Sequence, residues 1–382
     1  MGEVVQRARE LFVRRYESAP QWVARAPGRV NIIGEHTDYN DGYVMPIATD
    51  LATYTAAAAR EDVVVRVCSE AMEEEEQFSL DNLMPRGGHW SDYLRGVAWS
   101  LQEEGIELRG IDAVIVSSVP PGSGVSSSAA LEVSWALALL AAAGEQMDPV
   151  VLARVCQRAE NEFVGMKCGI MDQLAAVLGE EGMAVLIDCW TLEHELVPLP
   201  ADKVAVVVMD TGKPRALVES EYNARREQCE KAAQVLGVRA LRDATPEDVE
   251  AARERLGEVV YRRARHVVTE NERVLRMADA LREGKLDLAG ELLNASHRSL
   301  AEDYEVSCRE LDLICEIARQ QEGCYGARLV GAGFGGCAMA MVEAEATDEF
   351  CTAVKRQYDA KADYTSTVFA VRASGGAGLI EG

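Results

Sequence analysis

Apolar and polar residues recur along the chain with two periods, which predict a mixture of strands and helices. Short runs rich in β-branched residues indicate strands, and apolar residues spaced three and four apart indicate helices packed by one face. No internal repeat is present. Strands are expected at residues 30–33, 53–59, 63–67, 111–117 and 204–209. Helices are expected at residues 4–16, 90–101, 129–143, 149–164, 174–178, 219–236, 253–282, 287–302 and 308–320.

Two features of this pattern bear on the organisation of the chain. Residues 60–62 are charged and separate two of the expected strands, which predicts a β-hairpin. A new series of strands and helices begins after residues 190–202, without a low-complexity linker. A domain boundary is therefore expected there, dividing the chain into residues 1–195 and 196–382. A chain of 382 residues is long enough for two domains with their own cores.

The composition is that of a soluble globular protein, with 48% apolar and 27% charged residues. The formal net charge of −24 argues against nucleic acid and anionic membranes as partners, because both need a cationic surface. The first residues lack an apolar signal core, and the longest apolar run, residues 133–144, is too short to span a bilayer. The ten cysteines form no Cys-x-x-Cys pair, so reduced thiols are expected rather than zinc ligands or disulfides. The protein is therefore expected in the cytoplasm.

A glycine- and serine-rich segment lies between the strand expected at 111–117 and the helix expected at 129–143. Gly122 and Gly124 let the backbone approach an anion, and residues 126–128 offer serine hydroxyls. The following helix directs its N-terminal N–H groups at the loop. These features suit a phosphate-binding loop, although the Gly-Lys-Ser/Thr of a Walker A motif is absent. A connector with serine caps is the alternative, and the segment alone does not decide between the two.

A second polar segment follows the strand expected at residues 30–33. Glu35, His36 and Asp38 place three ionisable groups within four positions. A solvated turn is the commoner outcome for a loop of this composition. Carboxylates and an imidazole can also hydrogen-bond several hydroxyl groups at once, as a sugar pocket requires.

Three further features have both a structural and a functional interpretation. Asp172 stands near the start of an expected helix, where aspartate is usually a cap. Trp90 and Tyr93 open another helix, and their rings suit either the core or an adenine base. Residues 331–336 match a dinucleotide-binding glycine fingerprint, but a strand-like sequence follows them. A hairpin turn is expected there instead, either close to a ligand or as a plain tight turn.

Together these segments resemble a known family. Residues 28–40, Gly-Arg-Val-Asn-Ile-Ile-Gly-Glu-His-Thr-Asp-Tyr-Asn, resemble the galactokinase signature, within the superfamily of galactose, homoserine, mevalonate and phosphomevalonate kinases. The loop at 122–128 resembles the second motif of that superfamily, with Val125 where leucine is more usual. Residues 331–336 resemble the third motif. The resemblance covers essentially the whole chain, and it extends through residues 160, 168–173, 220–223, 296–300 and 303–308.

The resemblance implies an α+β fold of two lobes with the active site in the cleft between them. The N-terminal lobe would resemble the second domain of ribosomal protein S5, and the C-terminal lobe would resemble a ferredoxin-like sandwich. The sugar contacts implied are Glu35, His36, Thr37, Asp38, Gly169 and Tyr222. The ATP contacts implied are Ser69, Trp90, Tyr93, Gly122, Ser123, Gly124, Val125, Ser126, Ser127 and Ser128.

The resemblance also implies a reaction, a metal ion and a catalytic pair. ATP would be the co-substrate, and Ser128 and Glu160 would hold Mg²⁺, which prefers oxygen ligands. Asp172 and Arg29 match the catalytic pair. A carboxylate beside a guanidinium is a weak base, yet in phosphoryl transfer the attacking hydroxyl can lose its proton late. Asp172 could therefore orient and deprotonate the C1 hydroxyl of α-D-galactose, the entry step of galactose breakdown, while Arg29 balances charge on the transferring group.

Two alternatives to a galactokinase stay open at this point. One is a kinase for N-acetylgalactosamine or a related sugar, which room around the C2 hydroxyl would distinguish. The other is a sensor that binds galactose and ATP without catalysis. Sensors of this type lack a Ser-Ala pair in the central loop, whereas Ser128-Ala129 is intact here, which disfavours a sensor. The expected partners are galactose and ATP, and a monomer is the expected oligomeric state.

Overall fold

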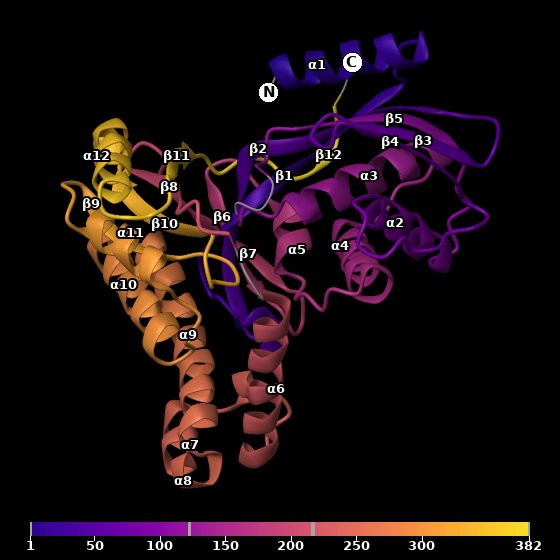
Figure 1. Ribbon diagram of the computed structural model, residues 1–382. Coiled ribbons are helices and arrows are strands. Elements are labelled where there is room, and N and C mark those ends of the chain that lie inside the picture. The colour runs from indigo at the N-terminus through magenta and orange to yellow at the C-terminus, as the bar shows by residue number, and fades with distance from the viewer. Residues whose placement is uncertain (1, 121–123, 215–217, 381–382) are drawn as a thin grey trace.

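The computed structural model describes residues 2–120, 124–214 and 218–380, without the side chains of residues 218–220. Two β-sheets, each covered by helices, form two lobes that meet along one side (Figure 1). This is the mixed α+β arrangement expected. Within the described ranges, no helix combines the length and the apolar character needed to cross a bilayer. All ten cysteines lie in the described ranges, and none of them is in a disulfide bond there.

The sheet of the first lobe has eight strands. They are β1 (Trp22–Ile33), β2 (Tyr43–Ala59), β3 (Val64–Ser69), β4 (Glu74–Ser79), β5 (Ile111–Ser117), β6 (Met183–Asp188), β7 (His194–Pro198) and β12 (Gly378–Ile380). The main order is β12-β1-β2-β5-β3-β4, and β6 and β7 extend from the other end of β2. Because β12 joins the outer edge of β1, this sheet is completed by the far end of the chain.

Helices cover both faces of this sheet. The helix α1 (Gly2–Tyr16) packs on one face against β2 and β5 (Figure 1). On the opposite face, α3 (Ser127–Ala143) and α5 (Met171–Leu178) lie against β1 and β2. The helices α2 (Ser91–Glu103) and α4 (Pro149–Arg158) pack beside α3. The serine-rich loop and Asp172 therefore reach the same side of the sheet.

The second lobe is built on an antiparallel sheet of four strands. Its strands are β8 (Val204–Asp210), β9 (Cys324–Leu329), β10 (Cys337–Glu343) and β11 (Thr367–Val371), in the order β11-β8-β10-β9. Its helices are α6 (Val218–Leu236), α7 (Pro246–Ala251), α8 (Arg253–Leu256), α9 (Glu258–Arg282), α10 (Leu286–Glu302), α11 (Arg309–Arg319) and α12 (Thr347–Asp359).

Both faces of β8 are buried, which explains how the lobes are joined. Val207 and Met209 pack with helices of the second lobe, whereas Val206 and Val208 face a core that also contains residues of β1 and β2. Alternate residues of a strand point to opposite faces, so one strand serves both cores. The two lobes therefore share a continuous hydrophobic core beside the cleft.

The hairpin expected across residues 60–62 is wrong. The two strands are present as β2 and β3, but β5 lies between them, antiparallel to β2 and parallel to β3. The link instead packs on the start of β5, where Arg60 pairs with Asp112 at 2.9 Å. β5 is apolar on both faces, so a central place in the sheet buries it better than an edge would.

Most of the expected elements are confirmed, and two expected helices are interrupted. The strand expected at 111–117 is β5 with the same bounds, and the strand at 204–209 is β8. The helix expected at 253–282 is divided into α8 and α9 at Gly257, which has a φ of 70°. The helix expected at 149–164 ends in a π-helical turn, Ala159–Val164. The turn at 331–336 joins two paired antiparallel strands, β9 and β10, so the expected hairpin is confirmed.

Candidate active site

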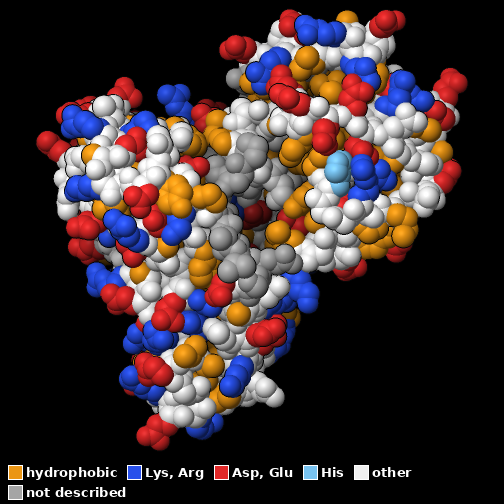
Figure 2. Space-filling view, in the orientation of Figure 1, with side chains coloured by type: hydrophobic (Ala, Val, Ile, Leu, Met, Phe, Trp, Pro, Cys, Tyr) orange, Lys and Arg blue, Asp and Glu red, His pale blue; other side chains and the backbone are white. Residues whose placement is uncertain are grey.

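A pocket of about 380 Å³ lies between the lobes, where the surface is hollowed (Figure 2). Residues from distant parts of the sequence gather in its wall. The expected site residues that line it are Arg29, Glu35, His36, Asp38, Gly124, Ser126, Ser127, Ser128, Glu160, Gly169, Asp172 and Tyr222. The other lining residues are Met166, Lys167, Cys168, Met171, Asn223, Gly331 and Ala332.

Two expected contact residues are buried behind this wall. Thr37 is fully buried, and its Oγ1 lies 2.8 Å from the Gly34 carbonyl oxygen and 2.7 Å from that of Tyr43. Val125 packs in the core shared by the two lobes. These two residues hold the shape of the loops, and they do not line the pocket.

Three further residues expected to contact ATP, of which Trp90 and Tyr93 were expected near adenine, do not line the pocket. Ser69 is the last residue of β3. The half-buried indole of Trp90 donates from Nε1 to Glu74 Oε2 at 2.7 Å. Burial raises the pKa of Tyr93, and the nearby Glu160 carboxylate raises it further. Their roles toward ATP stay predictions.

At the centre of the pocket, an ion pair joins β1 to α5. Arg29 Nε donates to Asp172 Oδ1 at 2.8 Å, and Arg29 Nη2 donates to Asp172 Oδ2 at 2.7 Å. Such a bidentate pair fixes the orientation of both groups. The Arg29 side chain is only 7% exposed, whereas that of Asp172 is 25% exposed. The carboxylate is therefore the partner that a bound molecule can reach.

The serine-rich loop is attached to the same pair. Arg29 Nη1 donates to the Gly124 carbonyl oxygen at 2.5 Å, and the Ser126 hydroxyl donates to Asp172 Oδ2. Ser126 has a φ of 59°, a strained value for a residue other than glycine. The loop, Arg29 and Asp172 thus form one hydrogen-bonded unit.

The start of α3 completes the anion-binding side of the pocket. Ser127 and Ser128 are its first residues, and both line the pocket. The helix N-terminus and serine hydroxyls are donors that suit phosphate oxygens. Lys167 also lines the pocket and adds a positive charge. Gly122 and Ser123, also expected to contact ATP, lie outside the described residues.

Asp38 and Gly169 form a tight contact near Asp172. A Cβ atom at position 169 would lie 1.8 Å from Asp38 Oδ2, so a larger residue there would have to displace the Asp38 side chain. Burial raises the pKa of Asp38 to about 7, and the neighbouring Asp172 carboxylate adds to the increase. Asp38 is therefore poised to gain or lose a proton near neutral pH.

His36 stands among tyrosines and is neutral. Its Nδ1 lies 2.8 Å from the Tyr39 hydroxyl, which lies 2.7 Å from the Tyr304 hydroxyl. The centre of the Tyr222 ring is 5.6 Å from that of His36. Burial lowers the pKa of His36 to about 3, so the ring carries no charge at neutral pH. These rings form a stiff wall with a neutral imidazole that can hydrogen-bond a hydroxyl group.

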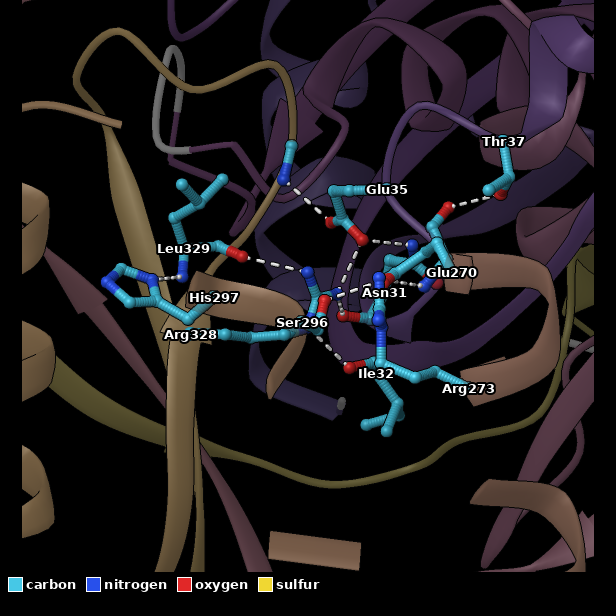
Figure 3. A network of polar contacts seen from close by, with 12 residues as sticks. Asn31, Ile32, Glu35, Thr37, Glu270, Arg273, Ser296, His297, Arg328 and Leu329 are labelled. Atoms are coloured by element: carbon cyan, nitrogen blue, oxygen red, sulfur yellow. Dashed lines mark hydrogen bonds and ion pairs between the residues drawn. The ribbon is translucent and has the colours of Figure 1, made fainter. Parts of the chain in front are cut away.

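Glu35 is 2% exposed and is held by donors from both lobes (Figure 3). Its Oε1 accepts from the Gly331 N–H at 2.8 Å, and its Oε2 accepts from Arg328 Nη2 and Asn31 Nδ2, each at 2.5 Å. Burial raises the pKa of Glu35, while Arg328 and the Gly331 N–H oppose the increase. Arg328 was not expected from the sequence, although a lone arginine in an apolar strand was an available signal.

A pair of buried glutamates lies behind the serine loop. Gln173 Nε2 donates to Glu160 Oε2 at 2.9 Å and to Glu132 Oε2 at 3.1 Å. Burial raises the pKa of Glu160 to about 7; the Asp172 carboxylate adds to this, and a contact with the Ser128 hydroxyl opposes it. Burial also raises the pKa of Glu132 well above its ordinary value. Glu132 was missed, although it is the single charged residue in the sequence of α3.

The donors expected to hold Mg²⁺ fit a site that is shared with a substrate. Within the described part of the chain, no group of three or more His, Cys, Asp or Glu side chains could hold a metal ion alone. Mg²⁺ needs only one or two carboxylates when phosphate oxygens and water supply the other ligands. Ser128 and Glu160 are in contact at the mouth of the anion-binding loop, and they offer two oxygen donors there.

Family models match three parts of the chain. A model of the galactokinase galactose-binding signature matches residues 10–59. Models of the N-terminal and C-terminal domains of GHMP kinases match residues 92–180 and 277–360. The first range includes residues 35–38, the second includes the loop at 122–128 and Asp172, and the third includes the turn at 331–336.

Curated relatives match nearly the full length. The galactokinase of Roseiflexus sp. (strain RS-1) is 45% identical over 382 residues, which cover 97% of this chain and 96% of that protein. The galactokinase of Chloroflexus aggregans (strain MD-66 / DSM 9485) is 47% identical over 353 residues, 91% of this chain and 90% of that protein.

Solved structures give the same result. The galactokinase of Lactococcus lactis, solved in complex with galactose, has a TM-score of 0.95 at 36% identity, covering 99% of this chain and 100% of that one. A mevalonate kinase at 17% identity shares the fold, with a TM-score of 0.65 over 92% of this chain and 99% of that one. Since relatives at this identity match almost every residue, the chain belongs to the galactokinase family.

Proposed function

We propose that this protein transfers the γ-phosphoryl group of ATP to the C1 hydroxyl of α-D-galactose, giving galactose 1-phosphate and ADP. The bidentate pair of Arg29 and Asp172 carries the proposal, because it stands between the phosphate-binding loop and the sugar-binding loop. A sugar and a nucleotide placed on these loops would meet at the pair. The galactokinase relatives, one of them solved with galactose, support the choice of sugar.

Asp172 has one acceptor position available for the attacking hydroxyl. An ionised carboxylate offers about four acceptor positions. Among the described residues, Oδ2 accepts from Arg29 and Ser126, and Oδ1 accepts from Arg29 alone. A sugar hydroxyl can therefore donate to Oδ1, which orients its oxygen toward the phosphoryl group. In a loose transition state the proton leaves late, so even a weak base can accept it.

Positive charge is arranged around the path of the phosphoryl group. Arg29 lies between Asp172 and the Gly124 carbonyl oxygen, at the edge of the serine loop. Lys167 lines the same pocket. Fixed donors and cations stabilise negative charge that develops on the transferring oxygens. We assign this role to Arg29, with Lys167 as a second cation.

We propose Ser128 and Glu160 as the protein ligands of Mg²⁺. When bound, the ion neutralises charge on the β- and γ-phosphates. Burial and the neighbouring Asp172 raise the pKa of Glu160 to about 7, so its ionised form gains from a cation. Gln173 donates to the Glu160 carboxylate and sets its orientation. We assign Gln173 the role of holding Glu160 toward Ser128.

We further propose that residues 1–195 form the lobe that supplies the loops and Asp172, and that residues 196–382 supply Tyr222 and the glycine turn. The strand β12 lies in the second range yet pairs with β1. We also propose a monomer as the active form. We expect this monomer to work in the cytoplasm.

The proposal is tested by the release of ADP from purified protein, ATP and Mg²⁺. ADP release is expected only when galactose is added. Turnover of galactose beside N-acetylgalactosamine measures the tolerance for a group larger than hydroxyl at C2. Binding of galactose and ATP with ADP release at background would show a sensor and would overturn the proposal.

A further inference from the structure

We propose that Arg328 is a positioning residue for sugar recognition. It fixes the Glu35 carboxylate so that a single acceptor position, on Oε1, is offered to the pocket. The inference rests on the proposed function, because it concerns how one of the sugar-binding groups is aimed. Arg328 itself does not line the pocket, so it acts through Glu35.

Arg328 is fully buried, with 0% exposure, and most of its donors reach into the first lobe (Figure 3). Nε donates to the Ile32 carbonyl oxygen at 2.7 Å, and Nη2 donates to that of Asn31 at 2.7 Å. Nη2 also donates to Glu35 Oε2 at 2.5 Å, and Nη1 donates to the Leu329 carbonyl oxygen at 2.9 Å. One planar guanidinium thus fixes both the main chain at the end of β1 and the side chain that follows it. A lysine ammonium could not reach all these acceptors at once.

The contacts that the described residues make with Glu35 show which acceptor position is left. Of about four positions on a carboxylate, Oε2 uses two, for Arg328 and Asn31. Oε1 uses one, for the Gly331 N–H at 2.8 Å. Glu35 and Gly331 both line the pocket. The second position of Oε1 is therefore the one that a sugar hydroxyl can use.

Arg328 pairs with Glu35, because the other buried carboxylate nearby has a different arginine as its partner. Glu270 is the other carboxylate in this network, and its Oε2 accepts from Arg273 Nε at 2.6 Å. Its Oε1 accepts from the Ser296 hydroxyl at 2.6 Å. Each carboxylate thus has its own guanidinium. Because the described partners of Glu35 are all donors, its ionised form is the one that they satisfy.

The glycine turn gains a role from this arrangement. Arg328 is on β9 and Gly331 is in the turn between β9 and β10, so both contacts to Glu35 come from the second lobe. The turn is held there by the Phe334 N–H, which donates to the Val306 carbonyl oxygen at 2.8 Å. The second lobe therefore aims a sugar-binding group that belongs to the first lobe.

The test compares Arg328→Lys with a matched control, Arg25→Lys. Arg25, on β1, is a buried arginine like Arg328, and it donates to the Gly375 carbonyl oxygen at 2.8 Å. For Arg328→Lys, the KM for galactose is expected to rise about tenfold, the worth of one charge-assisted hydrogen bond. The KM for ATP should stay unchanged. Arg25→Lys should alter neither constant, even where it lowers the melting temperature by a similar amount.

A panel of deoxygalactoses distinguishes a specific loss of Glu35 orientation from a general loss of order in the pocket. Calorimetric binding is measured without ATP for galactose and for the sugars that each lack one hydroxyl. In the unmodified protein, the sugar that lacks the hydroxyl bound by Glu35 loses affinity. In Arg328→Lys that particular loss should shrink, while the losses for the other deoxy sugars should persist.

The outcomes are distinct. Equal effects of Arg328→Lys on both KM values, or a uniform loss across the sugar panel, would overturn the inference. If that variant does not fold, Asn31→Ala removes a single donor from Glu35 and should give a smaller change of the same kind; no selective change would again overturn it. Absence of galactose-dependent ADP release by the unmodified protein would contradict the proposed function instead, and the binding panel would still test Arg328.

Discussion

The two sides of the pocket treat their buried carboxylates in opposite ways. On the sugar side, Glu35 and Glu270 each have an arginine and further donors as partners. Burial acts to raise the pKa of Glu270, but Arg273, with His266 and Arg328, lowers it to about 2. The charges on this side are satisfied by the protein alone.

On the transfer side, carboxylates outnumber their cationic partners. Burial raises the pKa of Asp38 and of Glu160 to about 7, and the Asp172 carboxylate adds to both increases. Arg29 is committed to Asp172. From this difference we expect the sugar side to be organised before any ligand binds, and the transfer side to gain stability when a cation binds. Substitutions on the two sides should therefore have different effects on activity and stability.

The largest effect is expected at the meeting point of the two sides. Asp172→Asn keeps the shape of the residue but removes the charge that pairs with Arg29 and accepts the proton. The kcat for galactose should fall by about 10²–10⁴-fold, the usual contribution of a general base. Calorimetry should show galactose binding with little change.

A control variant for this prediction is Glu180→Gln, which changes an exposed carboxyl just after α5. It should leave kcat unchanged. Full turnover by Asp172→Asn, or loss of galactose binding in that variant, would contradict the role of Asp172 in phosphoryl transfer.

The next effect concerns the cation. Glu160→Gln should raise the Mg²⁺ concentration needed for half-maximal activity by about 10–100-fold, because a metal-binding oxygen loses its charge. A titration of Mg²⁺ at fixed ATP measures this. Glu162→Gln, in the same π-helical turn but exposed, should need no more Mg²⁺ than the unmodified protein. Identical curves for the two variants would contradict the assignment.

The third effect is on stability, and it has opposite signs on the two sides. The pKa of Asp38 in the folded state is about 7, above its ordinary value of 3.8. The folded state therefore binds this proton more tightly, and the carboxyl costs stability as pH rises between these values. Asp38→Asn should be more stable than the unmodified protein at pH 8, by about 2 kcal/mol, with the difference vanishing near pH 4. Urea unfolding without ligands measures it.

Glu270→Gln provides the opposite case. The folded pKa of Glu270 is lowered from 4.5 to about 2, so its charge stabilises the fold above the ordinary pKa and that contribution is lost as pH falls through about 2. This variant should be less stable than the unmodified protein at neutral pH, by about 3 kcal/mol, since it leaves Arg273 without its charge partner. If both variants shift stability in the same direction, the contrast between the two sides fails.

The smallest effect is expected at the adenine side. Trp90→Leu should raise the KM for ATP about fivefold, the lower range for loss of stacking on a base, and should leave the KM for galactose unchanged. Trp190→Leu replaces an exposed tryptophan that does not line the pocket, so it serves as the control. An unchanged KM for ATP in both variants would show that Trp90 packs in the core and does not stack on adenine.

The sequence was most informative where a property is local. The strand at 111–117 and the helix at 287–302 follow from runs of neighbouring residues, and the structure has them as β5 and α10. The signature at residues 28–40 named Arg29 and Asp38, which do line the pocket. Each of these conclusions depends on residues close together in the chain.

Pairings between distant segments could not be predicted from the sequence. The insertion of β5 between β2 and β3 depends on a parallel pairing, and no local sequence pattern indicates such a pairing. Arg328 meets Glu35 across most of the chain, so neither residue shows in sequence that the other is its partner. Glu35 could be named from the sequence as an expected sugar contact, but its hydrogen bond with Arg328 on β9 could not.

The pairing of β12 with β1 also sets the timing of assembly during synthesis. Val23 lies opposite Ile380 in this pairing, so the outer neighbour of the strand that carries Arg29 is among the last described residues to leave the ribosome. At bacterial and eukaryotic elongation rates the interval between them is some tens of seconds. During that interval the edge of β1 is open to other strands, and a nascent chain of this protein has a natural point at which a chaperone could protect it.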